Sequence, residues 1–237
     1  MRVLGLIPAR GRSKGVARKN ARLLGGRPLV AYSADSALAA TGLARVVLST
    51  DDEEIAEIGR ACGLDVPFLR PAEFAADETP MVPVVQHALG WLERLGERFD
   101  AVCLLQPTVP FREPDEIDGC IDRLASSDAD AVLTMAPVPP TFNPHWVFVA
   151  DGSGFLRLST GEPYPIGRRQ DLPPAWHRDG SVYVTRRDVV TQQGSLLGRK
   201  VVGYEVQRRR HVNIDTAEDW ALAESIAAEL VTGTARV

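Results

Sequence analysis

Residues 3–20 read VLGLIPARGRSKGVARKN, an apolar run that stops at Pro8 and passes directly into a polar loop. A compact apolar run bounded by proline is typical of a buried β-strand. The loop that follows, residues 9–20, carries five basic side chains and two glycines. Because ligands of open α/β sheets bind beyond the carboxyl ends of the strands, the sequence places a cationic loop at such a binding edge.

The same alternation continues along the chain. Strand-like apolar runs recur at residues 46–48, 101–105, 131–134, 181–185 and 201–206. Helical periodicity begins at Pro28, begins again after a cap at Asp51 or Asp52, and then covers residues 80–95, 114–124 and 216–230. Alternating strands and helices predict an α/β fold with a mostly parallel sheet covered by helices on both faces.

Prolines interrupt this alternation after Met135. Residues 137–178 contain Pro137, Pro139, Pro140, Pro144, Pro173 and Pro174, with short extended pieces between them. We therefore expect one domain over residues 1–237, from which residues 137–178 leave as an inserted β-rich arm. The aromatic residues Phe142, Trp146 and Phe148 make this arm a candidate contact surface.

Composition excludes several other classes of protein. The 237 residues are 45% hydrophobic and 24% charged, with a net charge of −4, as in an ordinary globular protein without a global basic surface for nucleic acid. No apolar run approaches the ~20 residues of a membrane helix. Three cysteines without a CxxC motif indicate neither a disulfide framework nor a zinc cage. We expect a cytoplasmic protein with no nucleic-acid or membrane partner.

Three polar segments, residues 9–20, 106–112 and 213–219, are expected at the binding edge of the sheet. The first lacks the GxGxxG spacing of dinucleotide folds, and Lys14 precedes Gly15 where a P-loop would require the reverse order. Its chemistry nevertheless favours polyphosphate, because glycines let backbone N–H groups approach phosphate oxygens and basic side chains offset their charge. The alternative is a solvated basic loop.

Several ordered motifs then resemble one known family. Residues 7–20 fit I-P-A-R-x-x-S-K-G-x-x-x-K-N, and further matches are L-R-P-A-E at 69–73, L-Q-P-T-x-P-x-R at 105–112, R-Q-x-x-P at 169–173, G-S-V-Y at 180–183 and I-D-T at 214–216. Together they resemble the acylneuraminate cytidylyltransferases (CMP-sialic acid synthetases) over nearly the whole chain. Lys14-Gly15 and Lys19-Asn20 favour this branch over the relatives that activate Kdo.

The resemblance implies a Rossmann-like three-layer αβα sandwich of the nucleotide-diphospho-sugar transferase type. It also implies transfer of CMP from CTP to an acidic acceptor, release of pyrophosphate, a Mg²⁺ cofactor and a homodimer formed through the arm. The implied nucleotide-binding residues are Ala9, Arg10, Gly11, Ser13, Lys14, Lys19, Asn20 and Arg70. Arg10, Lys14 and Asp215 are implied to be catalytic. A surface ion pair is the alternative for Arg70.

Acceptor and metal residues are carried over in the same way. The implied acceptor-binding residues are Gln106, Thr108, Arg112, Arg169, Gln170 and Tyr183. Alternatively, Gln106 and Thr108 serve a turn shaped by prolines, and Arg112 anchors its loop. The alternative for Tyr183 is a place in the core or in an interface. Asp215 and Asn213 are the metal candidates, whereas the alternative for Asp215 is a helix N-cap with Glu218.

Two departures from the family pattern leave the acceptor open. Residues 77–81 read DETPM where the family shows D-T-A-S-S, and residues 177–180 read HRDG where many relatives have R-P-N-G. A sialic or legionaminic-type nonulosonic acid is the first expectation, and a small phosphonate or other non-sugar acid is the alternative. A non-catalytic nucleotide-binding protein would be expected to have lost Lys14 or Asp215, and both are present.

Overall fold

A computed structural model describes residues 1–13, 15–206 and 211–232. The strands of its main sheet are β1 (Val3–Pro8), β4 (Leu43–Ser49), β5 (Ala101–Leu104), β6 (Ala131–Pro137), β9 (Trp176–Arg186) and β10 (Val201–Glu205). The helices are α1 (Leu29–Ala39), α2 (Glu53–Ala61), α3 (Met81–Arg94), α4 (Pro114–Ala125), α5 (Arg187–Gln193) and α6 (Ala217–Thr232). Two short pairs complete the described elements: β2 (Leu23–Leu24) with β3 (Arg27–Pro28), and β7 (Phe148–Ala150) with β8 (Leu156–Leu158).

The six strands of the main sheet follow the order β10-β6-β9-β5-β1-β4. β1 pairs in parallel with β4 and β5, and β6 pairs in parallel with β10. β9 lies antiparallel between β5 and β6, because the chain leaves along β6 through the arm and returns beside it. The predicted mostly parallel sheet is confirmed.

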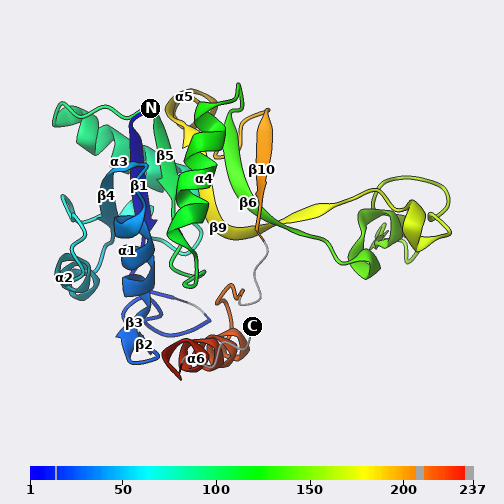
Figure 1. Cartoon of the computed structure of the whole chain (residues 1–237), viewed down its shortest axis with the longest axis horizontal. Helices are drawn as coiled ribbons and strands as arrows, with labels where there is room; N and C mark the ends of the chain where they lie inside the picture. The colour runs from blue at the N-terminus through cyan, green and yellow to red at the C-terminus, as the bar shows by residue number, and fades with distance from the viewer. Residues whose placement is uncertain (14, 207–210, 233–237) are drawn as a thin grey trace.

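Side chains of each strand alternate between two buried layers. From β1, Val3 and Ile7 pack with α1, α2 and α4 on one face, whereas Leu4 and Leu6 pack with α3 and α5 on the other. Figure 1 shows α1 and α4 in front of the sheet and α3 and α5 behind it. The three-layer α/β/α architecture is confirmed.

Most element boundaries match the periodicity of the sequence, and one helix was missed. Asp52 caps α2, as expected, by accepting the N–H of Ile55 at 3.1 Å. The missed helix, α5, has only seven residues, which is too short for a helical period to stand out from the flanking strand. Residues 66–69 form no strand but run beside β4 through isolated bridges.

β6 and β9 stay paired beyond the body of the sheet, out to Pro137 opposite Trp176. The segment between them carries β7 and β8 and projects away from the body, as Figure 1 shows. Of the three aromatic residues expected at its surface, Phe142 and Phe148 are exposed, whereas Trp146 is half-buried and donates its Nε1–H to the carbonyl of Ile166 at 2.6 Å. Phe155 and Tyr164 are also exposed. The arm itself is therefore present, whereas its role in dimerisation stays a prediction.

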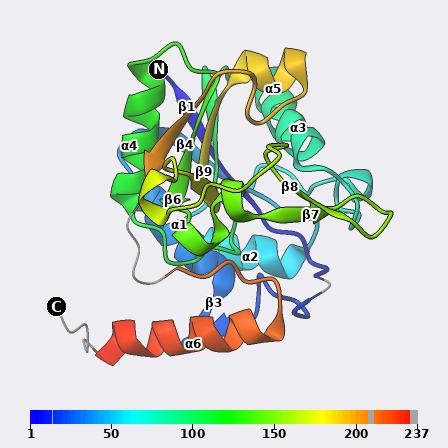
Figure 2. The same ribbon diagram turned by 90° about the vertical axis from the view of Figure 1, so that its right-hand side faces the viewer.

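Helix α6 lies below the carboxyl edge of the sheet, as Figure 1 and Figure 2 show. Trp220 and Ile226 of α6 form a buried cluster with Val16 of the cationic loop, Leu24 of the β2–β3 pair and Ile214. This cluster holds the first and third polar segments against each other. In the described part of the chain, no helix has both the length and the apolar character that crossing a bilayer requires.

Candidate active site

The cationic loop after β1 is anchored by backbone groups. The N–H of Ala9 donates to the carbonyl of Ser49 at 2.9 Å, which continues the pairing of β1 with β4. The N–H of Gly11 donates to Oδ1 of Asp51 at 3.0 Å, and the Asn20 amide donates to the carbonyl of Arg10 at 2.9 Å. These contacts hold the loop at both ends. Of its described basic side chains, Arg18 forms ion pairs with Asp52 and Glu54, whereas Arg10 and Lys19 line a cleft.

Both glycines of the loop allow close approaches that a side chain would block. A Cβ at Gly11 would lie 2.5 Å from Oδ2 of Asp52, and one at Gly15 would lie 1.8 Å from the carbonyl oxygen of Asp215. Real Cβ atoms do not come this close to other heavy atoms. Gly15 therefore brings the cationic loop into contact with the Asp215 segment, which is 200 residues away in the sequence.

A cleft of about 410 Å³ opens where the polar segments meet. Its described lining consists of Pro8, Arg10, Ser13, Gly15, Lys19, Asn20, Arg70, Phe74, Ala76, Asp77, Thr79, Met81, Val84, Gln106, Pro107, Thr108 and Asp215. The expectation that the three segments share one edge of the sheet is confirmed. A hydrogen bond from the N–H of Ile214 to the carbonyl of Thr108, at 2.8 Å, ties the second segment to the third.

Arg10 is a lining residue of this cleft. Its Nη1 lies 2.9 Å from Oδ1 of Asp77, and both side chains are about one-third exposed. Exposed ion pairs of this kind contribute little stability and are readily exchanged for another anion. A phosphate group entering the cleft can therefore replace Asp77 as the partner of Arg10.

Lys19 is a buried cation of the cleft, with its side chain 11% exposed. Its Nζ donates to the carbonyl of Ile214 and lies 3.6 Å from Oδ1 of Asp215. Burial lowers the pKa of Lys19 below the usual lysine value, and the Asp215 carboxylate opposes this shift. A further negative charge beside Nζ would stabilise the ammonium form.

Arg70 reaches the cleft from the segment after α2. Its N–H donates to the carbonyl of Thr50 at 2.7 Å, and its side chain is only 3% exposed. Among the described residues, Nε and Nη2 of this guanidinium have no hydrogen-bond partner, since the closest carboxylate oxygen, on Asp51, lies 3.7 Å away. Buried donors normally find partners, so two unsatisfied ones at a cleft indicate a place prepared for a ligand.

Asp215 does not cap α6, contrary to the alternative considered for it. The cap is formed by Asp219, whose Oδ2 accepts the N–H groups of Asp215 and Thr216 at 3.0 and 2.8 Å, and by the hydroxyl of Thr216, which accepts the N–H of Asp219 at 3.2 Å. The Asp215 side chain stays 66% exposed. Its carboxylate is therefore available at the rim of the cleft.

The oxygen atoms around Asp215 fit a cation that is held mainly by the phosphates of a bound substrate. The described residues contain no group of three or more acidic, histidine or cysteine side chains suited to a metal ion. Asn213 turns its Nδ2 toward Oδ2 of Asp215 at 3.0 Å, which leaves Asp215 as the better oxygen ligand. Mg²⁺ commonly binds through one or two carboxylates plus substrate phosphates, so one carboxylate beside a phosphate site fits this ion.

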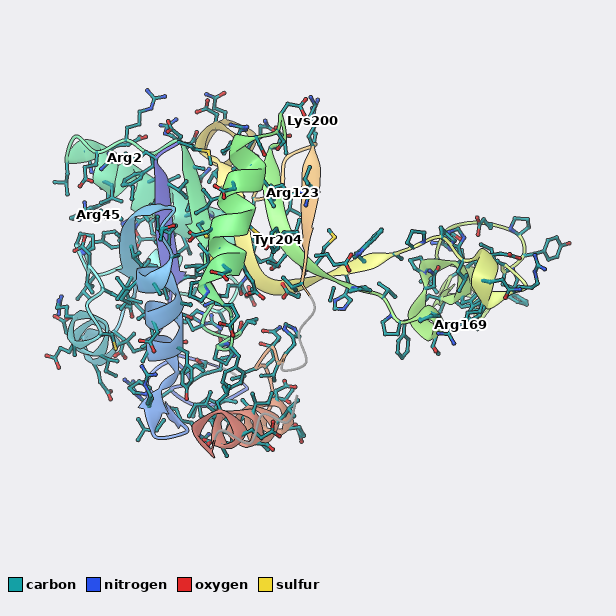
Figure 3. The ribbon with its side chains drawn as sticks, viewed as in Figure 1. Arg2, Arg45, Arg123, Arg169, Lys200 and Tyr204 are labelled. Carbon is teal, nitrogen blue, oxygen red and sulfur yellow. The ribbon has the colours of Figure 1, made fainter. Side chains whose placement is uncertain are left out.

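Seven of the predicted site residues that the structure describes do not line this cleft: Ala9, Gly11, Arg112, Arg169, Gln170, Tyr183 and Asn213. The guanidinium of Arg112 is buried and donates to Ser33 Oγ and to the carbonyl oxygens of Ser181 and Gln106, which supports the loop-anchoring alternative. Tyr183 is buried on β9, in the layer of α3 and α5. Arg169 and Gln170 lie on the arm, where Figure 3 shows Arg169 far from the body. Lys14 lies outside the described residues, and no contact of Lys14 is described.

Sequence reasoning missed two acidic residues of the site. Asp77, in the segment that departs from the family pattern, pairs with Arg10, and Asp51, considered only as a helix cap, anchors Gly11. For Asp51 the available signal was its place directly after a strand of the parallel sheet. Apolar side chains of Phe74, Met81 and Val84 add a wall to the cleft, so the departure at Met81 contributes to the site directly.

Comparisons with known proteins show what the whole chain is similar to. A family model described as cytidylyltransferase matches residues 4–218. The CMP-N,N'-diacetyllegionaminic acid synthase of Legionella pneumophila is 31% identical over 228 residues, with 95% of this chain and 96% of the relative covered. The pseudaminic acid cytidylyltransferase of Campylobacter jejuni is 28% identical over 228 residues, with 94% and 95% covered.

Among solved structures, a CMP:2-keto-3-deoxy-manno-octonic acid synthetase complexed with CTP superposes with a TM-score of 0.73 at 18% identity. The match covers 98% of this chain and all of the other. That likeness shows a shared fold. With the family model spanning both the cationic loop and the Asp215 segment, the chain belongs to the cytidylyltransferase family.

Proposed function

We propose that this cytidylyltransferase moves CMP from CTP to an acidic acceptor of the nonulosonic class, of sialic or legionaminic type, and releases pyrophosphate. The observation that carries the proposal is the buried Arg70 guanidinium, which lines the cleft together with Arg10 and Lys19 and whose Nε and Nη2 have no hydrogen-bond partner among the described residues. The relatives above are named for legionaminic and pseudaminic acids, and these names support the choice of acceptor class.

The chemistry of such a transfer asks mainly for positioning and charge compensation. A hydroxyl of the acceptor attacks the α-phosphorus of CTP, and pyrophosphate leaves on the opposite side. Arg10, Lys14 and Lys19 hold the triphosphate and offset the charge on its oxygens, and Arg70 holds the nucleoside end. Gln106 and Thr108, on the other wall of the cleft, contact the acceptor.

A Mg²⁺ ion would be held by Asp215 together with phosphate oxygens of CTP, with Asn213 beside it. It would supply positive charge to the phosphates during transfer. The carboxylate of Asp215 is suited to this because its exposed side chain takes no part in the cap of α6.

A pyrophosphate-release assay tests the proposed function. CTP is offered with a panel of nonulosonic acids, Kdo and small phosphonates, and ATP, GTP and UTP replace CTP in parallel. Turnover with CTP and a nonulosonic acid is expected. Turnover with a phosphonate alone would identify the alternative acceptor class, and no turnover with any acid would contradict the proposal.

We also propose that residues 137–178 form a homodimerisation arm, through which Arg169 and Gln170 serve an acceptor site. Its exposed aromatic residues support an interface, since large apolar patches on monomers commonly mark contact sites. Light scattering of the purified chain is expected to give the mass of a dimer. A monomer would contradict this assignment.

Replacing Asp215 by Asn should raise the Mg²⁺ concentration needed for half-maximal activity by about tenfold, because the variant keeps the shape of the ligand but loses its charge. The measurement is a Mg²⁺ titration at saturating CTP. Asp219→Asn is the control, since Asp219 caps α6 and is expected to affect stability more than the metal requirement. An unchanged titration for Asp215→Asn would remove Asp215 from the metal site.

Replacing Arg70 by Met should weaken CTP binding by about tenfold, since hydrogen bonds from a charged group are worth about 1.5–3 kcal/mol. The melting temperature should stay the same or rise, because the substitution removes a buried cation whose Nε and Nη2 lack partners. Calorimetric titration with CTP and thermal unfolding check the two parts. A strong loss of stability with unchanged CTP affinity would indicate a purely structural role.

A further inference from the structure

Asp51 contacts the cationic loop, lies near Arg70 and is not among the described lining residues of the cleft. Its Oδ1 accepts the N–H of Gly11 at 3.0 Å, and the same oxygen lies 3.7 Å from Nη2 of Arg70. The Asp51 side chain is 24% exposed. One carboxylate therefore serves both the loop expected at the phosphates and the arginine expected at the nucleoside.

The three described cations of the cleft differ in how their charge is balanced. Arg10 pairs with Asp77, and Lys19 lies near Asp215. Both of these carboxylates line the cleft and are substantially exposed, so an entering phosphate or a cation can take over their contacts. A bound triphosphate can therefore pair with Arg10 and Lys19 in place of these carboxylates.

The partner of Arg70 is different in kind. Asp51 is held by the Gly11 N–H, does not belong to the described lining and is less exposed than Asp77 and Asp215, so a ligand in the cleft is less able to take over its contact. The charge of Arg70 is compensated in part by Asp51, yet its Nε and Nη2 remain without hydrogen-bond partners among the described residues. A guanidinium with a carboxylate nearby and unpaired N–H groups can still donate directional hydrogen bonds, but it attracts an anion less strongly. Such a group suits a neutral acceptor, such as a nucleobase carbonyl, better than a phosphate.

We propose that Asp51 is a positioning and charge-balancing residue that makes Arg70 selective for the neutral end of the nucleotide. Asp51 thereby directs the triphosphate to the side of Arg10 and Lys19. The inference rests on the proposed function, because it takes CTP as the ligand of the cleft. It adds a residue that sets the direction in which the nucleotide binds.

Asp51→Asn separates the two tasks of the carboxylate. The asparagine oxygen can still accept the Gly11 N–H, whereas the charge that faces Arg70 is lost. Calorimetric titrations without acceptor compare CTP with inorganic tripolyphosphate, which has the anionic end but no nucleoside. We expect tripolyphosphate to bind about three- to tenfold more tightly to the variant, and the preference for CTP over tripolyphosphate to fall by about tenfold.

Asp118→Asn is the matched control. The Asp118 carboxylate also anchors a loop, by accepting the N–H groups of Thr41 and Gly42 at 2.9 and 2.8 Å, but it does not line the cleft. Its substitution should leave the preference unchanged. If Asp51→Asn changes the affinity for both ligands by the same factor, Asp51 only supports the loop and the proposal is overturned.

Arg70→Met tests the same assignment by changing the arginine of the Asp51–Arg70 pair. It also provides a test if Asp51→Asn does not fold. The proposal predicts weaker CTP binding with unchanged tripolyphosphate binding. An equal loss for the two ligands would place Arg70 at the phosphates and overturn the proposal. Because these titrations need no turnover, a failed pyrophosphate-release assay counts against the proposed function alone.

Discussion

Arg10→Ala should lower kcat for CMP transfer by about 10²–10³, the range found when one preorganised donor to a developing charge is removed. Arg10 faces the cleft from the loop after β1, and its present partner Asp77 can be exchanged for a phosphate. Because that ion pair is exposed, the loss should not come from unfolding. Steady-state kinetics at saturating CTP, with a melting curve of the variant, measure both parts.

Arg12→Ala is the matched control on the same loop. Arg12 is exposed and lies outside the described lining of the cleft, so turnover should change by less than about threefold on removal of a surface charge. Near-normal turnover of Arg10→Ala would exclude Arg10 from transition-state stabilisation. An equal loss in both variants would indicate a general effect of loop charge.

Gly15→Ala should reduce kcat/KM for CTP by about 10², since a misplacement of about 1 Å can cost that much. The added Cβ would lie 1.8 Å from the carbonyl oxygen of Asp215, and the atom that must give way is backbone. The substitution therefore pushes the cationic loop and the Asp215 segment apart. Kinetics over a range of CTP and Mg²⁺ concentrations should show that the variant needs more CTP and more Mg²⁺ for half-maximal activity.

Gly167→Ala provides the comparison, because a Cβ at Gly167 meets no atom within 4 Å and its backbone is not in the left-handed region. This variant should keep normal kinetics. If Gly15→Ala also keeps its activity and melting temperature, the close approach of the two segments is not needed for catalysis, and the site must tolerate a wider separation.

Local sequence patterns were sufficient for the layers of the fold. The continuous apolar run of residues 101–105 and the helical period of residues 80–95 each depend on neighbouring residues only. The binding edge follows from the same information, since parallel strands end on one side of their sheet. This is why Arg10, Lys19, Thr108 and Asp215 could be assigned to one cleft in advance.

Tertiary structure decided what each polar side chain touches. In the sequence, Arg70 precedes Pro71 and Arg112 lies two residues from both Pro110 and Pro114, so the local context does not show which groups either arginine contacts. In the fold, the donors of Arg112 are satisfied by buried oxygens, whereas Nε and Nη2 of Arg70 remain unsatisfied beside the cleft. Such partners come from strands and loops that are distant in sequence, so no local pattern encodes them.

The sequence by itself determined the α/β layers, the arm and the edge that carries the cationic loop, because periodicity and turn residues act over a few positions. Only the tertiary structure showed that Asp219 rather than Asp215 takes part in the cap of α6, and that Asp51 faces both Gly11 and Arg70. Hydrogen bonds and ion pairs act over a few ångströms. Which groups come within that range is settled when the β1 loop, the end of β4 and the segment before α6 pack against one another.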